Sequence, residues 1–374
     1  MLTVSNLSFQ FGKTILFDSV NVSFLNGNCY GIIGANGSGK STFLKILSGK
    51  LKPTSGSVLL ESNKRVSVLE QDHNSHNEFT IIDTVLKGNN ELYFVKKEMD
   101  SIYAKSNFSS EDADRVGELQ NRFEEMNGWS AESEASTLLS NIGISESLHN
   151  NLISSLSGIE KVKVLIAQCI FGNPDVLIMD EPTNDLDYDT INWLVSFLQT
   201  FENTVIVVSH DRHFLDSVCT HISDIDFGKI TNFTGNYSFW QQSSQLLLNQ
   251  KKIANKKSEE RIKELKEFIA RFSANVSKSK QATSRKKMLD KININEIKPS
   301  SRKYPGIIFE NERTLGDQIL NVENLSYIFE GVSYLSKVNF NVNKGDKIAL
   351  ISKKSKVCEF FFDIISEKIN STDG

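Results

Sequence analysis

This 374-residue chain has few cysteines and prolines, and it contains no apolar run long enough to cross a membrane. The four cysteines, Cys29, Cys169, Cys219 and Cys358, show no CxxC spacing, which argues against a zinc site and a disulfide framework. A membrane-spanning helix needs about 20 consecutive apolar residues, and the first residues, MLTVSNLSFQ, lack the pattern of a signal peptide. These absences predict a cytoplasmic protein with reduced thiols and no membrane partner.

Excess positive charge is confined to one segment. The whole chain has a formal net charge of −4. Between Lys251 and Lys303 there are 17 lysines and arginines against 6 aspartates and glutamates, a net charge of +11, so the rest of the chain carries −15. A basic segment in an otherwise acidic protein predicts a binding surface for a polyanion.

Residues 34–41 read GANGSGKS, the pattern of a phosphate-binding loop. The apolar run Cys29 to Ile33 before it predicts a buried strand, and FLKIL after it has helical spacing. Glycines let consecutive N–H groups wrap phosphates, and the N-terminus of the following helix adds a favourable dipole. In this pattern the lysine neutralises the β- and γ-phosphates and the serine hydroxyl binds Mg²⁺. The residues expected to bind ATP here are Gly34, Asn36, Gly37, Ser38, Gly39, Lys40, Ser41 and Thr42.

A second apolar run, Val176 to Met179, delivers two carboxylates at its carboxyl end. Open parallel sheets bind ligands at that end of their strands. We therefore expect Asp180 to hold Mg²⁺ and Glu181 to take the proton from the attacking water, a role that contributes about 10²- to 10⁴-fold in rate. The next apolar run begins at Thr204 and leads to His210, which is expected to lie near the γ-phosphate.

Two further residues complete the expected nucleotide site. Gln71 follows the apolar strand RVSVLE and is expected to contact Mg²⁺ and the attacking water. Phe11 stands just ahead of Gly12 and is expected to stack on adenine. Stacking of a base on an aromatic ring contributes about 1 to 3 kcal/mol.

The order of these motifs, with the run LSGIE at Leu156 to Glu160 among them, resembles the ABC ATPases. The stretch SHDRHFLDSVCTHISDIDFGKITNFTGNYSFW resembles the ABC-F branch, and RFSANVSKSKQATSRKKMLDKI is similar to the YbiT type within it. This resemblance implies an α/β fold, a P-loop NTPase cassette with a helical subdomain, and an ATPase that uses ATP and Mg²⁺ and acts on ribosomes. It also implies a signature of Ser157, Gly158 and Glu160, in which Ile159 replaces the family's second glycine.

The resemblance also implies three domains. A first ABC cassette covers residues 1–238, a basic helical hairpin covers 239–303, and the start of a degenerate second cassette covers 317–374. Within the first cassette, residues 88–137 form a helical insertion. The charged residues from Glu111 to Glu134 are mostly acidic, which favours contact with protein over direct contact with RNA.

The linker has the pattern of an antiparallel helical hairpin. Ile262, Leu265 and Ile269 recur at helical spacing, which indicates a narrow apolar seam, and Leu289 can face it from a return helix. In the ABC-F branch the equivalent hairpin reaches the tRNA site of the ribosome, whereas the alternative is a charged coiled coil that is only solvated. The residues expected to bind ribosomal RNA or tRNA are Arg271, Lys278, Lys280, Arg285, Lys286 and Lys287.

A shift of 318 residues aligns the end of the chain with its beginning, without a gap. Asn6, Leu7 and Ser8 then fall on Asn324, Leu325 and Ser326. The phosphate loop is not preserved, so the second repeat is expected to have lost its nucleotide site. Under this shift Gly34, Gly37, Gly39, Lys40 and Ser41 become Ser352, Ser355, Val357, Cys358 and Glu359.

An ABC site is composite, because ATP on one cassette's phosphate loop is closed by the signature of another cassette. The chain carries one signature, so we expect slow turnover by a single chain, partly restored when two copies pair as a homodimer. The favoured interpretation is a shortened ABC-F ATPase that binds ribosomal RNA or tRNA. Two alternatives stay open: a non-hydrolysing ATP-binding fragment, which ATPase measurements would reveal, and the ATPase subunit of an ABC transporter, which would co-fractionate with membranes.

Overall fold

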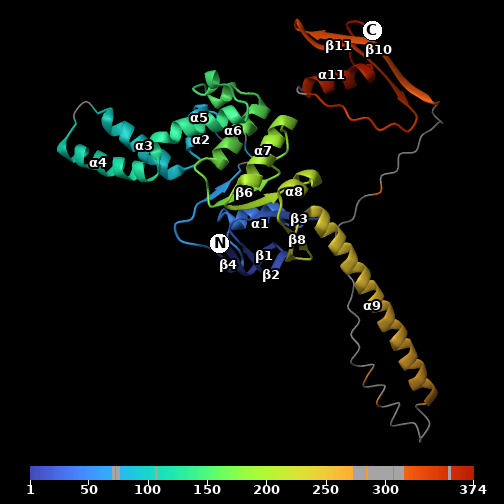
Figure 1. Ribbon diagram of the computed structural model, residues 1–374. Coiled ribbons are helices and arrows are strands. Elements are labelled where there is room, and N and C mark those ends of the chain that lie inside the picture. The colour runs from blue at the N-terminus through green and yellow to red at the C-terminus, as the bar shows by residue number, and fades with distance from the viewer. Residues whose placement is uncertain are drawn as a thin grey trace. The chain divides into compact units, whose positions relative to one another are not determined.

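The computed structural model describes residues 1–69, 72, 76–105, 108–272, 284, 288, 306, 316–352 and 355–374. The chain divides into two compact units, Met1–Lys303 and Tyr304–Gly374. Figure 1 shows that the first unit contains two sheets, a group of helices and the long helix α9. The domain boundaries expected from the sequence stay predictions.

The buried apolar runs of the sequence form a six-stranded sheet in the order β5-β6-β7-β3-β8-β9. Every pair in it is parallel except β8 with β9. The side chains of β3, β6 and β7 are buried almost throughout, as expected for parallel strands covered on both faces. The strands are β3 (Cys29–Gly34), β5 (Val66–Val68), β6 (Val176–Asp180), β7 (Thr204–Val208), β8 (His221–Asp226) and β9 (Lys229–Thr234).

A smaller antiparallel sheet, in the order β2-β1-β4, shares a core with helix α1 (Lys40–Leu47). The fully buried rings of Phe17 and Phe43 are 5.5 Å apart, centroid to centroid, across this core. The core therefore anchors the helix that follows the phosphate loop. The strands are β1 (Leu2–Phe11), β2 (Thr14–Phe24) and β4 (Ser55–Leu60).

Helices dominate the region between β5 and β6. In the helix Ser110–Glu125, the side chains of Val116, Leu119 and Phe123 are buried, and their i, i+3 and i+7 spacing places them on one face. The preceding helix, which the sequence pattern did not single out, packs beside it. The elements are α2 (Ile81–Leu86), α3 (Asn90–Tyr103), α4 (Ser110–Glu125), η1 (Gly128–Ser130), α5 (Ala131–Asn141), η2 (Glu146–Leu148), η3 (Ile153–Ser155) and α6 (Gly158–Ile170).

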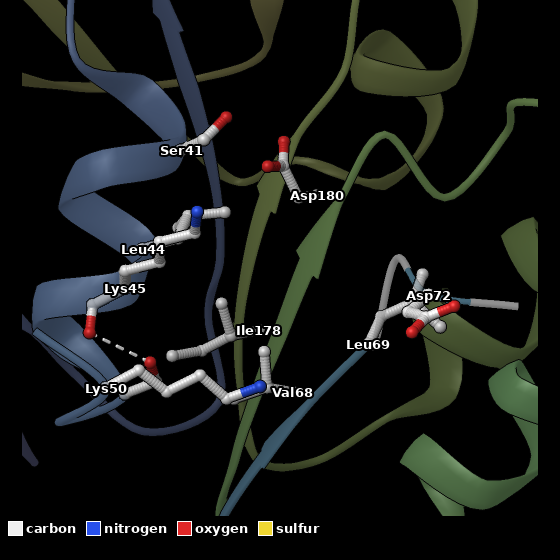
Figure 2. Close-up of a pocket in the computed structure, with 10 residues that line it drawn as sticks. Ser41, Leu44, Lys45, Lys50, Val68, Leu69, Asp72, Ile178 and Asp180 are labelled. Atoms are coloured by element: carbon white, nitrogen blue, oxygen red, sulfur yellow. Dashed lines mark hydrogen bonds between the residues drawn. The ribbon is translucent and has the colours of Figure 1, made fainter. Parts of the chain in front are cut away.

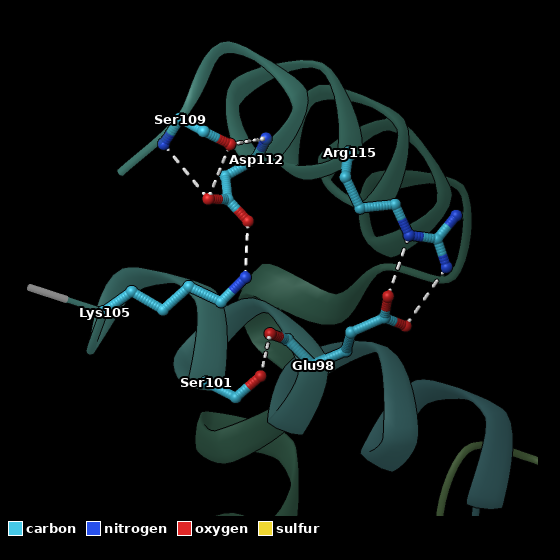
Figure 3. A network of polar contacts seen from close by, with 6 residues as sticks. All are labelled: Glu98, Ser101, Lys105, Ser109, Asp112 and Arg115. Carbon is cyan, nitrogen blue, oxygen red and sulfur yellow. Dashed lines mark hydrogen bonds and ion pairs between the residues drawn. The ribbon is translucent and has the colours of Figure 1, made fainter. Parts of the chain in front are cut away.

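Ion pairs link α3 to α4, as Figure 3 shows. Arg115 donates two hydrogen bonds to the carboxylate of Glu98, at 2.8 and 3.2 Å. Lys105 contacts Asp112, whose pKa is lowered to about 2 by this contact and by hydrogen bonds from Ser109. Exposed pairs of this kind contribute little stability individually. They do show that part of the acidic charge of this insertion is neutralised within it.

The described part of the first unit continues after β6 with the helices α7 (Tyr188–Thr200), α8 (Arg212–Val218) and α9 (Tyr237–Phe272). Helix α9 has 36 residues, so it is about 54 Å long. On the seam predicted from the sequence, Leu265 is buried and Ile262 and Ile269 are half-buried. The predicted tip and return helix of the hairpin lie outside the described residues.

The second unit contains the hairpin of β10 (Gln318–Phe329) and β11 (Val332–Asn343) and the helix α11 (Ser355–Ile365). The residues that would correspond to β3, 347–352, form no strand, and Ile351 is 88% exposed. No parallel strand stands beside them within the described part of this unit. Four residues form its core: Val322, Leu325, Leu335 and Phe361.

The hairpins of the two units correspond residue by residue. In β1 and β2, Leu2 pairs with Phe24 and Phe11 with Thr14, and in β10 and β11 the residues 318 positions later pair in the same way. The four core residues of the second unit also correspond to core residues of the first. The pairs are Val4 and Val322, Leu7 and Leu325, Phe17 and Leu335, and Phe43 and Phe361.

Candidate functional site

The expected phosphate loop joins the carboxyl end of β3 to the first turn of α1. Gly37 (φ 79°) and Gly39 (φ 97°) adopt the left-handed region, which residues with a Cβ disfavour. Gly34 permits close packing, because a Cβ there would lie 2.5 Å from the Ser38 Oγ and 2.8 Å from the carbonyl oxygen of Ile225. These glycines allow a tight turn just before a helix N-terminus, an arrangement suited to binding phosphates.

Lys40 and Ser41 are the first two residues of α1. The Lys40 ammonium donates hydrogen bonds to the carbonyl oxygens of Gly34 and Ala35, both at 3.1 Å. The cation is therefore held against the loop, where it can neutralise a bound phosphate. Ser41 is exposed and lines a cavity of about 280 Å³.

Asp180 ends β6 and lines the same cavity. Figure 2 shows Ser41 and Asp180 on either side of the space between α1 and β6. A hydroxyl, a carboxylate and phosphate oxygens form the kind of hard-oxygen ligand set that Mg²⁺ prefers. The residues present therefore fit Mg²⁺ bound together with ATP.

Glu181 follows β6 in a left-handed conformation (φ 51°) that is uncommon for a residue with a Cβ. One of its carboxylate oxygens accepts a hydrogen bond from the His210 N–H at 3.1 Å, and the other lies 3.4 Å from the His210 Nε2. Burial raises the pKa of Glu181, although the hydrogen bond from His210 opposes this effect. Backbone strain and a raised pKa at a strand end are both typical of catalytic carboxylates.

The expected signature forms the exposed N-terminus of α6. Ser157 caps the helix: its Oγ accepts a hydrogen bond from the Glu160 N–H at 3.4 Å, and the Glu160 carboxylate accepts one from the Ser157 N–H at 2.9 Å. A Cβ at Gly158 would meet no atom within 4 Å. This helix end can therefore face the phosphates of a nucleotide on another molecule.

A protein-family model described as "ABC transporter" matches residues 17–184, and a second model with the same description matches residues 223–309. The ABC transporter ATP-binding protein YkpA of Bacillus subtilis is 53% identical over 374 residues, which are 100% of this chain and 69% of that protein. The chain belongs to the ABC ATPases. The α/β P-loop cassette fold, the family and the ATPase class expected from the sequence are confirmed.

Further relatives of this ABC ATPase cover a similar range. The probable ATP-binding protein YbiT of Escherichia coli O157:H7 is 45% identical over 94% of this chain and 66% of its own length. The ABC transporter F family member 5 of Arabidopsis thaliana is 31% identical over 91% and 50%. This chain thus spans about two thirds of YkpA and YbiT.

Among solved structures, a nucleotide-free ATP-binding cassette from an ABC transporter aligns with a TM-score of 0.48 and 23% identity over 65% of this chain and 95% of that one.

Of the remaining predicted residues of this ABC ATPase, the structure describes some and leaves others outside the described residues. Phe11 is 70% exposed beside the Phe9 ring, 6.0 Å away between centroids, so one face can receive an adenine. Gln71 lies outside the described residues, as do the basic residues of the predicted hairpin tip. Arg271 stands near the end of α9, but its side chain is not described. The basic residues outside are Lys278, Lys280, Arg285, Lys286 and Lys287.

Sequence reasoning missed one ion pair near the site. The Lys163 Nζ lies 2.6 Å from one carboxylate oxygen of Asp187, whose other oxygen accepts the Thr190 N–H at 2.8 Å. Burial opposes the charged form of Asp187, yet Lys163 and Thr190 outweigh it and lower its pKa. The pair joins the signature helix α6 to the N-terminus of α7. No distinctive spacing marks such a pair in one sequence, because the partners are far apart along the chain.

Proposed function

We propose that this ABC ATPase couples the binding and hydrolysis of ATP to the binding of ribosomal RNA or tRNA by its basic linker, in the cytoplasm. The charge distribution carries the proposal. The segment from Lys251 to Lys303 has a net charge of +11, whereas the rest of the chain carries −15 and would repel a polyanion. Helix α9 joins this basic segment directly to the cassette.

The geometry of the first cassette supports the nucleotide half of the proposal. Lys40 and the N-terminus of α1 would hold the phosphates, and Ser41 and Asp180 would hold Mg²⁺, which neutralises phosphate charge during phosphoryl transfer. Glu181 would accept the proton of the attacking water, and His210, in contact with it, would sense the γ-phosphate. Gln71 would complete the contacts with Mg²⁺ and water.

The RNA half rests on the length of α9 and on the sequence beyond it. A helix of 36 residues places its far end about 54 Å from its start. The six basic residues between Arg271 and Lys287 have no acidic residue among them. A basic cluster that follows a long helix in the sequence is suited to phosphate contacts away from the acidic cassette.

A ribosome co-sedimentation series in increasing salt tests the linker. We expect the wild type to bind with a steep salt dependence, since each single-strand phosphate contact adds a slope of about −0.7. Replacing five basic residues with Gln should weaken binding and reduce the slope by about 3.5, while the affinity for a fluorescent ATP analogue stays the same. These residues are Lys278, Lys280, Arg285, Lys286 and Lys287.

A matched control removes the same charge from exposed lysines elsewhere. It should sediment with ribosomes as the wild type does, because the proposal depends on where the charge lies. Equal pelleting of all three proteins at every salt concentration would show that the linker is only a solvated coiled coil. The control substitutes Gln at Lys229, Lys337, Lys344, Lys347 and Lys356.

The composite nature of an ABC site adds an expectation about turnover. The exposed N-terminus of α6, with Ser157 and Gly158, is available to close a nucleotide bound to a second copy. We therefore propose that two chains form a homodimer during hydrolysis, so turnover per chain should rise with protein concentration. Turnover that is brisk and independent of concentration would contradict this pairing.

The alternative is the ATPase subunit of a membrane transporter, the activity named in the family description. No helix within the described residues is long and apolar enough to span a bilayer, so such a subunit would need a membrane partner. Fractionation of cells separates the two functions. Recovery with membranes and absence from the ribosome fraction would favour the transporter.

A further inference from the structure

Helix α8 lies between the nucleotide site and the linker helix. It begins at Arg212, two residues after His210, and is capped by Asp211, which accepts hydrogen bonds from the N–H groups of His213 at 2.9 Å and Phe214 at 3.1 Å. Only seven residues long, it ends at Val218. About two helical turns therefore separate His210 from the C-terminal end of α8.

The contact of α8 with β3 is close. A Cβ on Gly31 would lie 2.8 Å from the Cys219 Sγ and 3.2 Å from a methyl carbon of Leu215. The side chains of Phe214 and Leu215 are both 1% exposed in the core of the first unit. Closely packed interiors have low compressibility and transmit strain. Helix α8 is thus held by the strand that carries the phosphate loop.

Side chains of α8 also contact the first turn of α9. The Asp216 carboxylate accepts hydrogen bonds from the Ser238 N–H at 2.7 Å and from the Ser238 Oγ at 2.5 Å. The Arg212 guanidinium lies 5.7 Å from the centre of the Tyr237 ring. Trp240, one turn on, is 6% exposed and belongs to the same core cluster as Leu215. A carboxylate at a helix N-terminus also interacts favourably with the helix dipole.

The backbone connection from β9 to α9 is short. Gly235 joins β9 to the start of α9 with φ of 120°, a conformation that favours glycine. Its N–H donates to the carbonyl oxygen of Thr220 at 2.8 Å. The covalent link consists of Gly235 and Asn236, whereas the side-chain contacts to α8 hold the direction of the helix.

From these contacts we infer that α8 and the first turn of α9 form a joint through which the state of the nucleotide site sets the direction of the linker helix. The inference rests on the proposed role of His210 as the residue that senses the γ-phosphate. A rotation of 10°, taken as an example, would move a point 19 residues along α9 by about 5 Å, since that point is about 29 Å from the joint. Asp216 is the positioning residue, because it bonds both the backbone and the side chain of Ser238.

Distance measurements between two spin labels test the joint in the full chain. The labels are attached at Ser196→Cys on α7 and Lys257→Cys on α9, both exposed. Cys358→Ser removes the one cysteine that is not buried, and the buried Cys29, Cys169 and Cys219 are poorly accessible to the label. With a non-hydrolysable ATP analogue and Mg²⁺, the wild-type distance should change by several ångströms.

The variants separate the joint from general damage to the fold. Asp216→Ala should abolish the nucleotide-dependent change in distance while leaving the affinity for the ATP analogue unaltered. Ser238→Ala, which keeps the backbone bond to Asp216, should reduce the change, and Ser238→Thr should retain it. Ser244→Ala, on α9 beyond the joint, should behave as wild type. Its hydroxyl bonds only the carbonyl of Gln241 within the same helix.

Two contrary results are distinguishable. A labelled wild type that binds the ATP analogue and shows no change in distance, or an Asp216→Ala variant that shows the full change, would overturn the joint and leave the nucleotide site standing. A labelled wild type that fails to bind the analogue at all would overturn the proposed nucleotide site, on which the joint depends.

Discussion

The two units of this protein contain the same hairpin with different loops beside it. In the first, the Asn6 N–H donates to the Asn21 Oδ1 at 2.8 Å, and in the second the Asn324 N–H donates to the Asn339 Oδ1 at 2.7 Å. The Ser19 N–H donates to the Ser8 Oγ at 3.0 Å, and the equivalent bond of the second unit has the same length. The hairpin is thus held by its core and polar contacts, independently of phosphate-binding residues.

The difference lies at the N-terminus of the following helix. Helix α1 begins at Lys40, whereas α11 begins at Ser355, which corresponds to Gly37. In the second unit, residues that replace the left-handed glycines of the loop are therefore helical. Once the glycines are gone, a helical backbone is the better conformation for these residues. In the first unit, the left-handed conformations of Gly37 and Gly39 therefore keep these two positions in the phosphate loop and out of α1.

An aromatic cluster accompanies this change. The ring of Phe360, at the position of Thr42, lies 4.9 Å from Tyr327 and 5.4 Å from Phe329, between centroids. Phe329 corresponds to Phe11, the residue expected to stack on adenine. It is 39% exposed, compared with 70% for Phe11. In the second unit, packing within the chain covers part of the surface that faces solvent in the first.

The largest expected effects come from the two cores. Phe43→Ala and Phe361→Ala each remove a buried ring, and such changes cost about 3 to 5 kcal/mol. All three tryptophans lie in the first unit. In urea unfolding followed by tryptophan fluorescence, Phe43→Ala should lower the midpoint. Phe361→Ala should leave it unchanged, because this ring belongs to a core within the second unit, which contains no tryptophan. Equal shifts would show that the units unfold together.

A smaller free-energy change is expected when equivalent residues near the N-termini of α1 and α11 are replaced, and it concerns the affinity for ATP. Lys40→Ala should weaken binding of a fluorescent ATP analogue by more than about tenfold, because hydrogen bonds to charged groups contribute about 1.5 to 3 kcal/mol. Cys358→Ala, at the corresponding place in the second unit, should leave the affinity unaltered. The comparison fails if both substitutions weaken binding equally, or if neither does.

The smallest effects should come from the shared asparagine contacts. Asn21→Ala and Asn339→Ala each remove an exposed hydrogen bond to a backbone N–H, which costs about 0.5 to 1.5 kcal/mol. Hydrogen exchange should accelerate at the Asn6 amide in the first variant and at the Asn324 amide in the second. Acceleration in the unsubstituted hairpin would mean that the two units do not respond separately.

Much of the fold follows from local patterns. The apolar runs before Gly34, Asp180 and His210 predict β3, β6 and β7, and the glycine loop predicts the start of α1. Helix α3 was not singled out, although it packs beside α4. Its ion pairs with α4, such as Glu98 with Arg115, become apparent only when the two helices are adjacent. The roles of the predicted site residues stay predictions, because geometry shows proximity and not chemistry.

Residue types at fixed spacing along the chain are enough to establish the family, the phosphate loop, the acidic strand end and the internal repeat. The contacts between residues far apart in the chain become apparent in the folded structure. The pairs Lys163 with Asp187, Glu181 with His210 and Asp216 with Ser238 are separated by 22 or more residues. Such contacts depend on how sheets and helices pack, and side-chain packing is a property of the whole core that spacing along one segment does not encode.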